Sequence, residues 1–196
     1  MLLLADIVFI LVDILISENY QSLLAIGRDL GYAEIYQYIK EFWITTLLFL
    51  LAISRRQFIY LAWSALYFYF LLDDSFQIHE KIGRIIVRYF ELEPLFEIRA
   101  QTIGSLAVSV LTGLILFSAI SISYFFSNVQ GKSTSKYLFV LTVGVVFFGV
   151  FVDTIHAALP GTISFWSLVE DGGEMLAMSI VVAYVYNLNL KPTWTK

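Results

Sequence analysis

Long apolar runs, separated by short polar segments, are the feature that most restricts how this chain can fold. Of its 196 residues, 59% are hydrophobic and 14% are charged, whereas a soluble domain is about half apolar and a quarter charged. A helix that crosses a bilayer needs about 20 consecutive apolar residues, so the chain has room for about six such helices. We therefore expect an all-α polytopic membrane helix bundle, with residues 1–196 forming a single integral membrane domain.

Six apolar runs reach or approach the length of a membrane-spanning helix. The first run is short and carries Asp6 and Asp13, which makes it the weakest candidate. We expect the third helix to continue to about Arg88. The short Pro160–Gly161 turn predicts that the last two runs pack as an antiparallel pair. The expected spans are Leu2–Ile16, Ile35–Ser54, Phe58–His79, Ile98–Phe126, Tyr137–Leu159 and Ser164–Leu188.

The segments between the runs differ in character. Glu18–Leu30 and Ile85–Glu97 mix polar and apolar residues at helical spacing, which is typical of amphipathic segments in the membrane interface. Asn128–Lys136 is polar throughout most of its length and is expected to form a loop. The chain has no cysteine, which excludes disulfides and thiolate metal sites. It also has no basic tract of the kind that binds nucleic acid.

The basic residues at the two ends of the expected bundle bear on its orientation. Their numbers are equal, but one end has no acids in its loops, whereas the other mixes bases with acids. Because Lys and Arg are enriched in cytoplasmic loops, we expect both termini in the cytoplasm and the protein in an inner or plasma membrane. The purely basic end has Arg55, Arg56, Lys132, Lys136, Lys191 and Lys196, and the mixed end has Arg28, Lys40, Lys81, Arg84, Arg88 and Arg99.

Several ionisable residues lie inside the apolar runs. At a rise of about 1.5 Å per residue, Asp73, Asp153 and Glu174 fall at similar depths in the third, fifth and sixth runs. A charged side chain that faces lipid near mid-bilayer costs about 2.5–3.5 kcal/mol or more. We therefore expect these side chains to face the interior of the bundle and to meet in one layer. His156 follows Asp153 by three residues and shares its helix face.

This layer contains more carboxyl groups than nearby protein cations. Like charges in a medium of low dielectric constant cannot all ionise, which indicates shared protons or a bound cation. Zinc, iron and manganese accept mixed carboxylate and imidazole ligands. Gly172 and Gly173 would let a neighbouring helix or a ligand approach the backbone closely. The expected metal ligands are Asp73, Asp74, His79, Asp153, His156, Glu170 and Glu174, and the expected catalytic bases are Glu80 and Asp171.

These residues favour a metal-dependent intramembrane enzyme. A bound divalent metal would activate water for a hydrolase reaction on a lipid-like substrate, and iron would allow oxidation instead. Two alternatives use the same residues. The first is a proton or cation channel or transporter, because buried acids and histidines form proton relays. The second is a non-catalytic subunit that holds a cofactor or metal in a membrane complex. Membrane lipids are expected partners, a homo-oligomer is possible, and nucleic acid is not expected.

Overall fold

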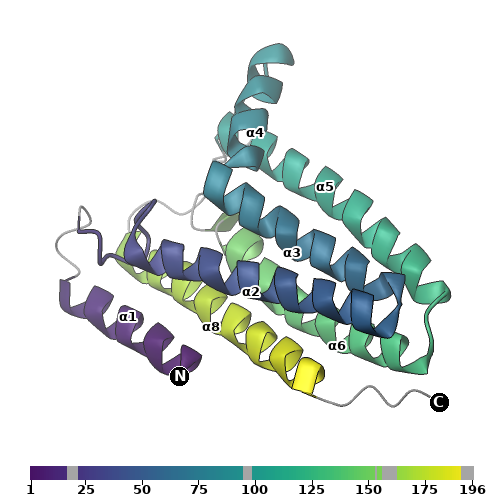
Figure 1. The fold of residues 1–196 in the computed structure, drawn as a ribbon. Helices are drawn as coiled ribbons and strands as arrows, with labels where there is room; N and C mark the ends of the chain where they lie inside the picture. The colour runs from purple at the N-terminus through teal and green to yellow at the C-terminus, as the bar shows by residue number, and fades with distance from the viewer. Residues whose placement is uncertain (17–21, 95–98, 153, 156–162, 191–196) are drawn as a thin grey trace.

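Helices make up every regular element in the part of the chain that the structure, a computed structural model, describes (Figure 1). This part is residues 1–196 without 17–21, 95–98, 153, 156–162 and 191–196. The all-α prediction is thereby confirmed. The elements are α1 (Leu2–Ile16), α2 (Tyr32–Arg55), α3 (Phe58–Phe76), α4 (Ile78–Tyr89), α5 (Ala100–Phe125), α6 (Val129–Val146), the π-helical segment η1 (Phe147–Val152) and α8 (Ile163–Leu190).

The long helices α2, α3, α5, α6 and α8 run side by side as a bundle (Figure 1). The shorter helix α1 packs along the first half of α8, whereas α4 leaves one end of the bundle and points away from it (Figure 1). Helices α6 and α8 are packed neighbours and run in opposite directions, as the short connection between them predicts. The chain therefore crosses the length of the bundle repeatedly, and each end of the bundle collects a separate set of connections.

The interior of the bundle combines aromatic packing with paired polar groups. Trp63 and Tyr67 on α3 have no solvent exposure. The Trp63 indole Nε1 donates a hydrogen bond to Ser135 Oγ at 2.9 Å, and the Tyr67 hydroxyl shares one with Thr142 Oγ1 at 2.8 Å. Buried polar atoms need such partners because an unmade hydrogen bond costs about 1–3 kcal/mol. These two bonds fix the register between α3 and α6.

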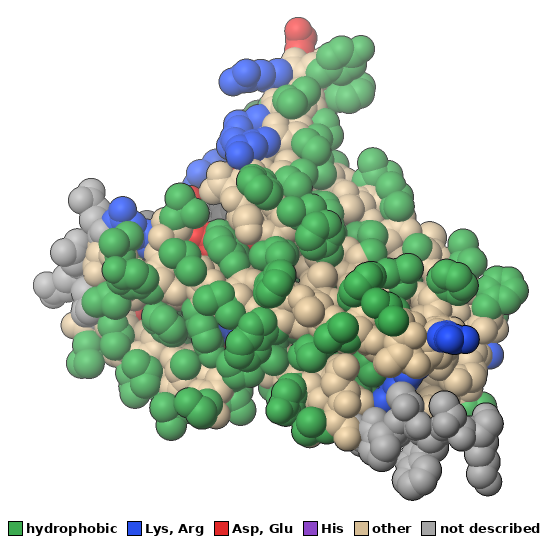
Figure 2. Space-filling view, viewed as in Figure 1, with side chains coloured by type: hydrophobic (Ala, Val, Ile, Leu, Met, Phe, Trp, Pro, Cys, Tyr) green, Lys and Arg blue, Asp and Glu red, His purple; other side chains and the backbone are tan. Residues whose placement is uncertain are grey.

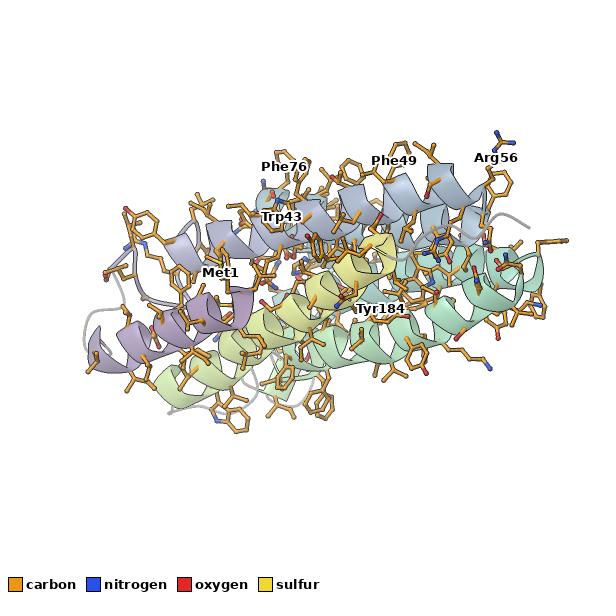
Figure 3. All side chains as sticks on the ribbon, turned by 60° about the horizontal axis from the view of Figure 1, so that its bottom comes forward. Met1, Trp43, Phe49, Arg56, Phe76 and Tyr184 are labelled. Atoms are coloured by element: carbon orange, nitrogen blue, oxygen red, sulfur yellow. The ribbon has the colours of Figure 1, made fainter. Side chains whose placement is uncertain are left out.

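Many large apolar side chains are exposed on the bundle, and they are spread over the face shown in Figure 2. Large side chains such as Phe49 and Phe76 point away from the helices into the surroundings (Figure 3). Helix α5 and the α6–η1 segment are long and apolar enough to cross a membrane, and only 17% and 28% of their most apolar windows are buried. The core helix of a soluble protein would be mostly covered. The other expected spans remain predictions.

The expected loop at Asn128–Lys136 is wrong. Asn128 instead begins α6 as its N-cap, with its side-chain oxygen accepting a hydrogen bond from the Gly131 backbone N–H at 2.8 Å. Asparagine is among the best N-cap residues because its oxygen satisfies a backbone donor that the first helical turn leaves free. The polar residues that suggested a loop are therefore the first turns of a helix.

The expected continuous helix from Phe58 to Arg88 is also wrong, because it is interrupted at Gln77. This residue adopts a left-handed conformation (φ 50°, ψ 48°) that ends α3 and begins α4. The Asp73 carboxylate accepts a hydrogen bond from the His79 backbone N–H at 2.8 Å, which supplies one of the acceptors that the first turn of α4 lacks. The break turns α4 out of the bundle.

The described part of the segment Glu18–Leu30 does not form the amphipathic helix that its spacing suggested. Its described residues, 22–30, form turns. The Asp13 carboxylate accepts a hydrogen bond from the Ile26 backbone N–H at 2.9 Å and ties these turns to α1. This arrangement places Ile26 against the start of α8, beside the site described below.

Candidate acidic site in the bundle

Three carboxylates from three helices meet near one end of the bundle. Glu41 on α2, Asp74 on α3 and Glu174 on α8 each place a carboxylate oxygen within 4.8 Å of the others. Glu41 is fully buried, at 0% exposure, and neither of its carboxylate oxygens has a hydrogen-bond partner among the described residues. We call these three residues the acidic cluster.

The position of Glu41 follows from the buried face of α2. Gln37, Glu41, Ile44 and Leu48 are all buried and recur at spacings of four, three and four residues, which puts them on one side of a helix. Glu41 therefore points inward for the same geometric reason as Leu48. One turn earlier, the Gln37 side-chain amide donates a hydrogen bond to Glu174 Oε1 at 3.2 Å. This bond orients one carboxylate of the acidic cluster.

The π-helical segment η1 approaches the acidic cluster from another side. Gly149 lies so close to Glu174 that a Cβ atom added to it would be 2.8 Å from Glu174 Oε2. On α8, a Cβ atom on Gly173 would overlap the Phe148 ring, and one on Gly172 would contact Ile10 at 3.4 Å. The expectation that Gly172 and Gly173 permit close approach is therefore confirmed by packing against η1 and α1. π-helical turns are often found at functional sites.

A buried ion pair lies on the other side of α2. Lys40 Nζ is 3.1 Å from Asp6 Oδ1, and both side chains have 0% exposure. Lys40 also donates to the Met175 carbonyl at 2.9 Å and to Ser179 Oγ at 3.5 Å. The assignment of Lys40 to the basic residues at one end of the bundle is therefore wrong, because this lysine is inside and its charge is compensated by α1.

Asp73 and His79 form a second pair at the junction of α3 and α4. Asp73 Oδ2 lies 2.9 Å from His79 Nδ1, while the other carboxylate oxygen caps the first turn of α4. The hydrogen bond with the Asp73 carboxylate raises the pKa of His79, which lies on α4 outside the two candidate spans. A carboxylate on Nδ1 fixes the ring orientation and leaves Nε2 for another partner.

A cavity of about 170 Å³ is lined by the Asp73–His79 pair and by two residues of the acidic cluster, Asp74 and Glu174. Its lining combines exposed Asp29 with partly buried Asp74 and Glu174. Acidic side chains are visible near the base of α4 in the space-filling view (Figure 2). The cavity is lined by Ile26, Asp29, Ala33, Glu34, Gln37, Asp73, Asp74, Gln77, His79, Glu80, Asp171, Glu174 and Met175.

The predicted site residues are distributed over this region in a definite way. Asp74 and Glu174 belong to the acidic cluster, while Asp73, His79, Glu80 and Asp171 line the cavity around it. Glu80 lies 3.4 Å from Arg84 on the same helix, and Glu170 is partly buried on α8. Asp153 and His156 lie outside the described residues. The role of these residues as metal ligands or bases remains a prediction.

Glu41 was missed by the sequence reasoning although its signal was present. It lies six residues inside the apolar run Ile35–Ser54, next to Lys40. Two adjacent charges within a span require partners in the interior, and counting Lys40 with the end loops concealed this. The same depth argument that selected Asp73 and Glu174 would have selected Glu41.

Fold and site together define an all-helical chain with an acidic cluster enclosed by its helices. The chain belongs to the family described as a domain of unknown function, DUF8692, whose model matches residues 3–188. Neither the curated proteins nor the solved structures contain a match to this chain.

Proposed function

We propose that this protein is a polytopic integral membrane protein. The support is the combination of outward apolar side chains and enclosed charges. A soluble monomer rarely exposes contiguous apolar patches larger than a few hundred Å², whereas large apolar side chains are exposed on α1, α2, α5 and α6. In a bilayer these side chains contact acyl chains, and Lys40, Asp6 and Glu41 stay away from lipid.

Within this protein, the acidic cluster binds a divalent metal ion. The observation that carries the proposal is Glu41, a fully buried carboxylate with neither oxygen hydrogen-bonded by a described residue, placed among two more carboxylates. Burying a charged group without a partner is strongly unfavourable, and three adjacent carboxylates repel one another. A cation among Glu41, Asp74 and Glu174 removes both penalties.

The ligand atoms favour particular metals. The acidic cluster supplies oxygen atoms, and manganese accepts all-oxygen coordination more readily than zinc, which prefers nitrogen and sulfur ligands. Iron suits the cluster if an imidazole joins it. Among zinc, iron and manganese, we therefore favour manganese, with iron as the next choice.

The reaction we propose is hydrolysis of an ester or amide in a lipid-like substrate. A metal held by Glu41, Asp74 and Glu174 would supply Lewis acidity, which would lower the pKa of a nearby water and polarise the substrate carbonyl. His79, oriented by Asp73, accepts a proton from the attacking water and returns it to the leaving group as the bond between the acyl carbon and that group breaks. Glu80 and Asp171 line the same cavity and are the alternative bases.

Metal analysis of the detergent-purified protein tests the site. We expect about one manganese or iron per chain after loading. Glu41→Gln and Glu174→Gln should lower metal affinity by at least about tenfold. Glu93→Gln, which changes an exposed carboxylate after α4, is the control and should bind as the wild type does. Absence of binding at saturating manganese, iron and zinc would overturn the proposal.

A proton or cation pathway is the second candidate, and one observation favours it. The cavity is lined by exposed Asp29 and also by Asp74 and Glu174 of the acidic cluster. A proton shared between Glu41 and Asp74 would also satisfy their oxygens. Proton uptake into liposomes, abolished in Asp73→Asn and Glu174→Gln and indifferent to manganese, would select this function over hydrolysis.

A further inference from the structure

Helix α4 packs against α5 on one side and projects from the end of the bundle. It leaves one end of the bundle in a direction different from that of the long helices (Figure 1). If the long helices cross a bilayer, α4 lies near its surface. This position is where amphipathic helices insert an apolar face between headgroups and acyl chains.

Two exposed faces run along α4. The apolar face consists of Ile82, Ile85 and Tyr89, which follow one another at spacings of three and four residues and are 41%, 63% and 80% exposed. Such spacing places them on one side of the helix. The aromatic residue is at the free end, and tyrosine is enriched at the membrane–water interface.

The basic face consists of Lys81, Arg84 and Arg88, which also follow at three and four residues and are all exposed. Figure 2 shows basic and apolar side chains together on this projecting part of the molecule. Arg84 Nη1 lies 3.4 Å from Glu80 Oε2, and both side chains are more than 40% exposed. The face therefore keeps a net positive charge.

The remaining face of α4 is fixed against α5. Gly83 and Gly104 meet so closely that a Cβ atom on Gly83 would lie 2.6 Å from the Ser105 backbone nitrogen. This contact sets the rotation of α4 about its axis. The apolar and basic faces are consequently held on the outside of the molecule.

We propose that α4 is a docking surface for the headgroups of anionic phospholipids. The basic face attracts the negatively charged headgroups. The apolar face inserts into the membrane interface, and this insertion does not depend on the charge of the lipid. The proposal rests on the membrane location proposed above and is independent of the metal. Because His79 and Glu80 in the first turn of α4 also line the cavity, the bound headgroups would lie beside the candidate site.

Fluorescence quenching in reconstituted vesicles tests this proposal, and the absence of natural cysteines makes single-site labelling direct. A fluorophore is attached to Tyr89→Cys, and vesicles contain a trace of headgroup-nitroxide lipid that is either phosphatidylglycerol or phosphatidylcholine. We expect about fivefold stronger quenching by the anionic lipid, consistent with the attraction of several basic residues. The preference should fall in high salt, which screens exposed charges.

Two variants and a second label make the result decisive. The variant K81Q/R84Q/R88Q should lose the preference, whereas R56Q/K132Q/K136Q, which removes three charges at the other end of the bundle, should keep it. Equal quenching by both lipids at Tyr89→Cys would overturn the proposal. A second label at Leu111→Cys on α5, probed with acyl-chain nitroxides, tests the membrane location separately. Quenching at Leu111→Cys without an anionic preference at Tyr89→Cys would reject only the docking surface. Absence of quenching at both positions would reject the membrane location as well.

Discussion

Adjacent residues on α2 meet opposite electrostatic conditions. Lys40 is compensated by Asp6 and by the carbonyl of Met175, whereas Glu41 faces two other carboxylates. Each lies on a different side of the helix because successive residues are rotated by about 100°. The protein thus separates a buried ion pair from a cluster of three carboxylates.

The Lys40–Asp6 pair predicts a large stability effect. Asp6→Ala should lower the thermal midpoint in detergent by about 10 °C, because breaking a buried pair costs about 3–5 kcal/mol and leaves the lysine charge buried. The double variant Asp6→Ala/Lys40→Met should recover most of this loss, since no unpaired charge remains. Circular dichroism during heating measures both. Equal destabilisation by the single and double variants would contradict this account.

The sequence predicted some site residues by a depth argument that needs no tertiary structure. Asp74 and Glu174 carry charge deep within apolar runs, so their inward orientation follows from the cost of facing lipid. The pairing of Asp73 with His79 could not be predicted in this way. It depends on the left-handed conformation of Gln77, a residue type that rarely adopts positive φ, and a regular helix would have placed His79 on a different side.

The helices position the site through close contacts at glycines. Gly149 gives Glu174 room beside η1, and Gly83 with Gly104 brings the backbones of α4 and α5 together. By contrast, no described atom outside the local helix backbone lies within 4 Å of a Cβ position at Gly113 or Gly144. These two groups of glycines allow matched tests, because the same change to alanine creates a contact in one group and none in the other.

Gly149→Ala should weaken metal binding without unfolding the protein. The new methyl group would lie 2.8 Å from Glu174 Oε2, so the flexible carboxylate must move away, and metal affinity should fall by about tenfold. Gly144→Ala, five residues earlier, is the control and should leave metal affinity unchanged. Titration of apo-protein with manganese, read by calorimetry, measures the difference. An unchanged manganese affinity in Gly149→Ala would show that Glu174 is not a metal ligand.

Gly83→Ala should displace α4 from α5. The added Cβ would lie within 3 Å of three backbone atoms of Gly104 and Ser105, and backbone cannot move aside as a side chain can. We expect destabilisation of about 1–3 kcal/mol, the usual cost of overpacking. Gly113→Ala on α5 should be neutral or stabilising, since alanine favours helix by about 1 kcal/mol. Protease cleavage after α4, compared between the two variants, would report the displacement.

The sequence predicted the positions of the helices better than the points where they break. The apolar runs placed α2, α3, α5 and α8 to within a few residues. The polar residues after Asn128 led to the wrong prediction of a loop. Composition alone does not distinguish a loop from a polar first helical turn that follows a capping residue. Asn128, a residue type that is common at helix N-caps, was the signal that could have predicted the start of α6.

The molecule as a whole has an apolar exterior along the bundle and polar groups at its ends and inside. Arg56, which ends α2, and Val129, which begins α6, lie at one end of the bundle, and Glu93 follows α4 at the other. The sequence alone did not settle the orientation, since the basic residues were equally divided. Because Lys40 is buried, the α4 end has one accessible base fewer, and we predict that in the proposed membrane location the Arg56 end lies in the cytoplasm.

This orientation can be tested with single cysteines in intact cells or right-side-out vesicles. Arg56→Cys and Val129→Cys should resist a membrane-impermeant maleimide until the membrane is opened by detergent, whereas Glu93→Cys should react from outside. The cysteine-free wild type should not react under either condition and gives the background. The reverse labelling pattern would show that the protein has the opposite orientation, with the candidate site near the cytoplasmic surface. Reaction of all three positions from one side would mean that the bundle does not cross the bilayer, because its two ends must then share one compartment.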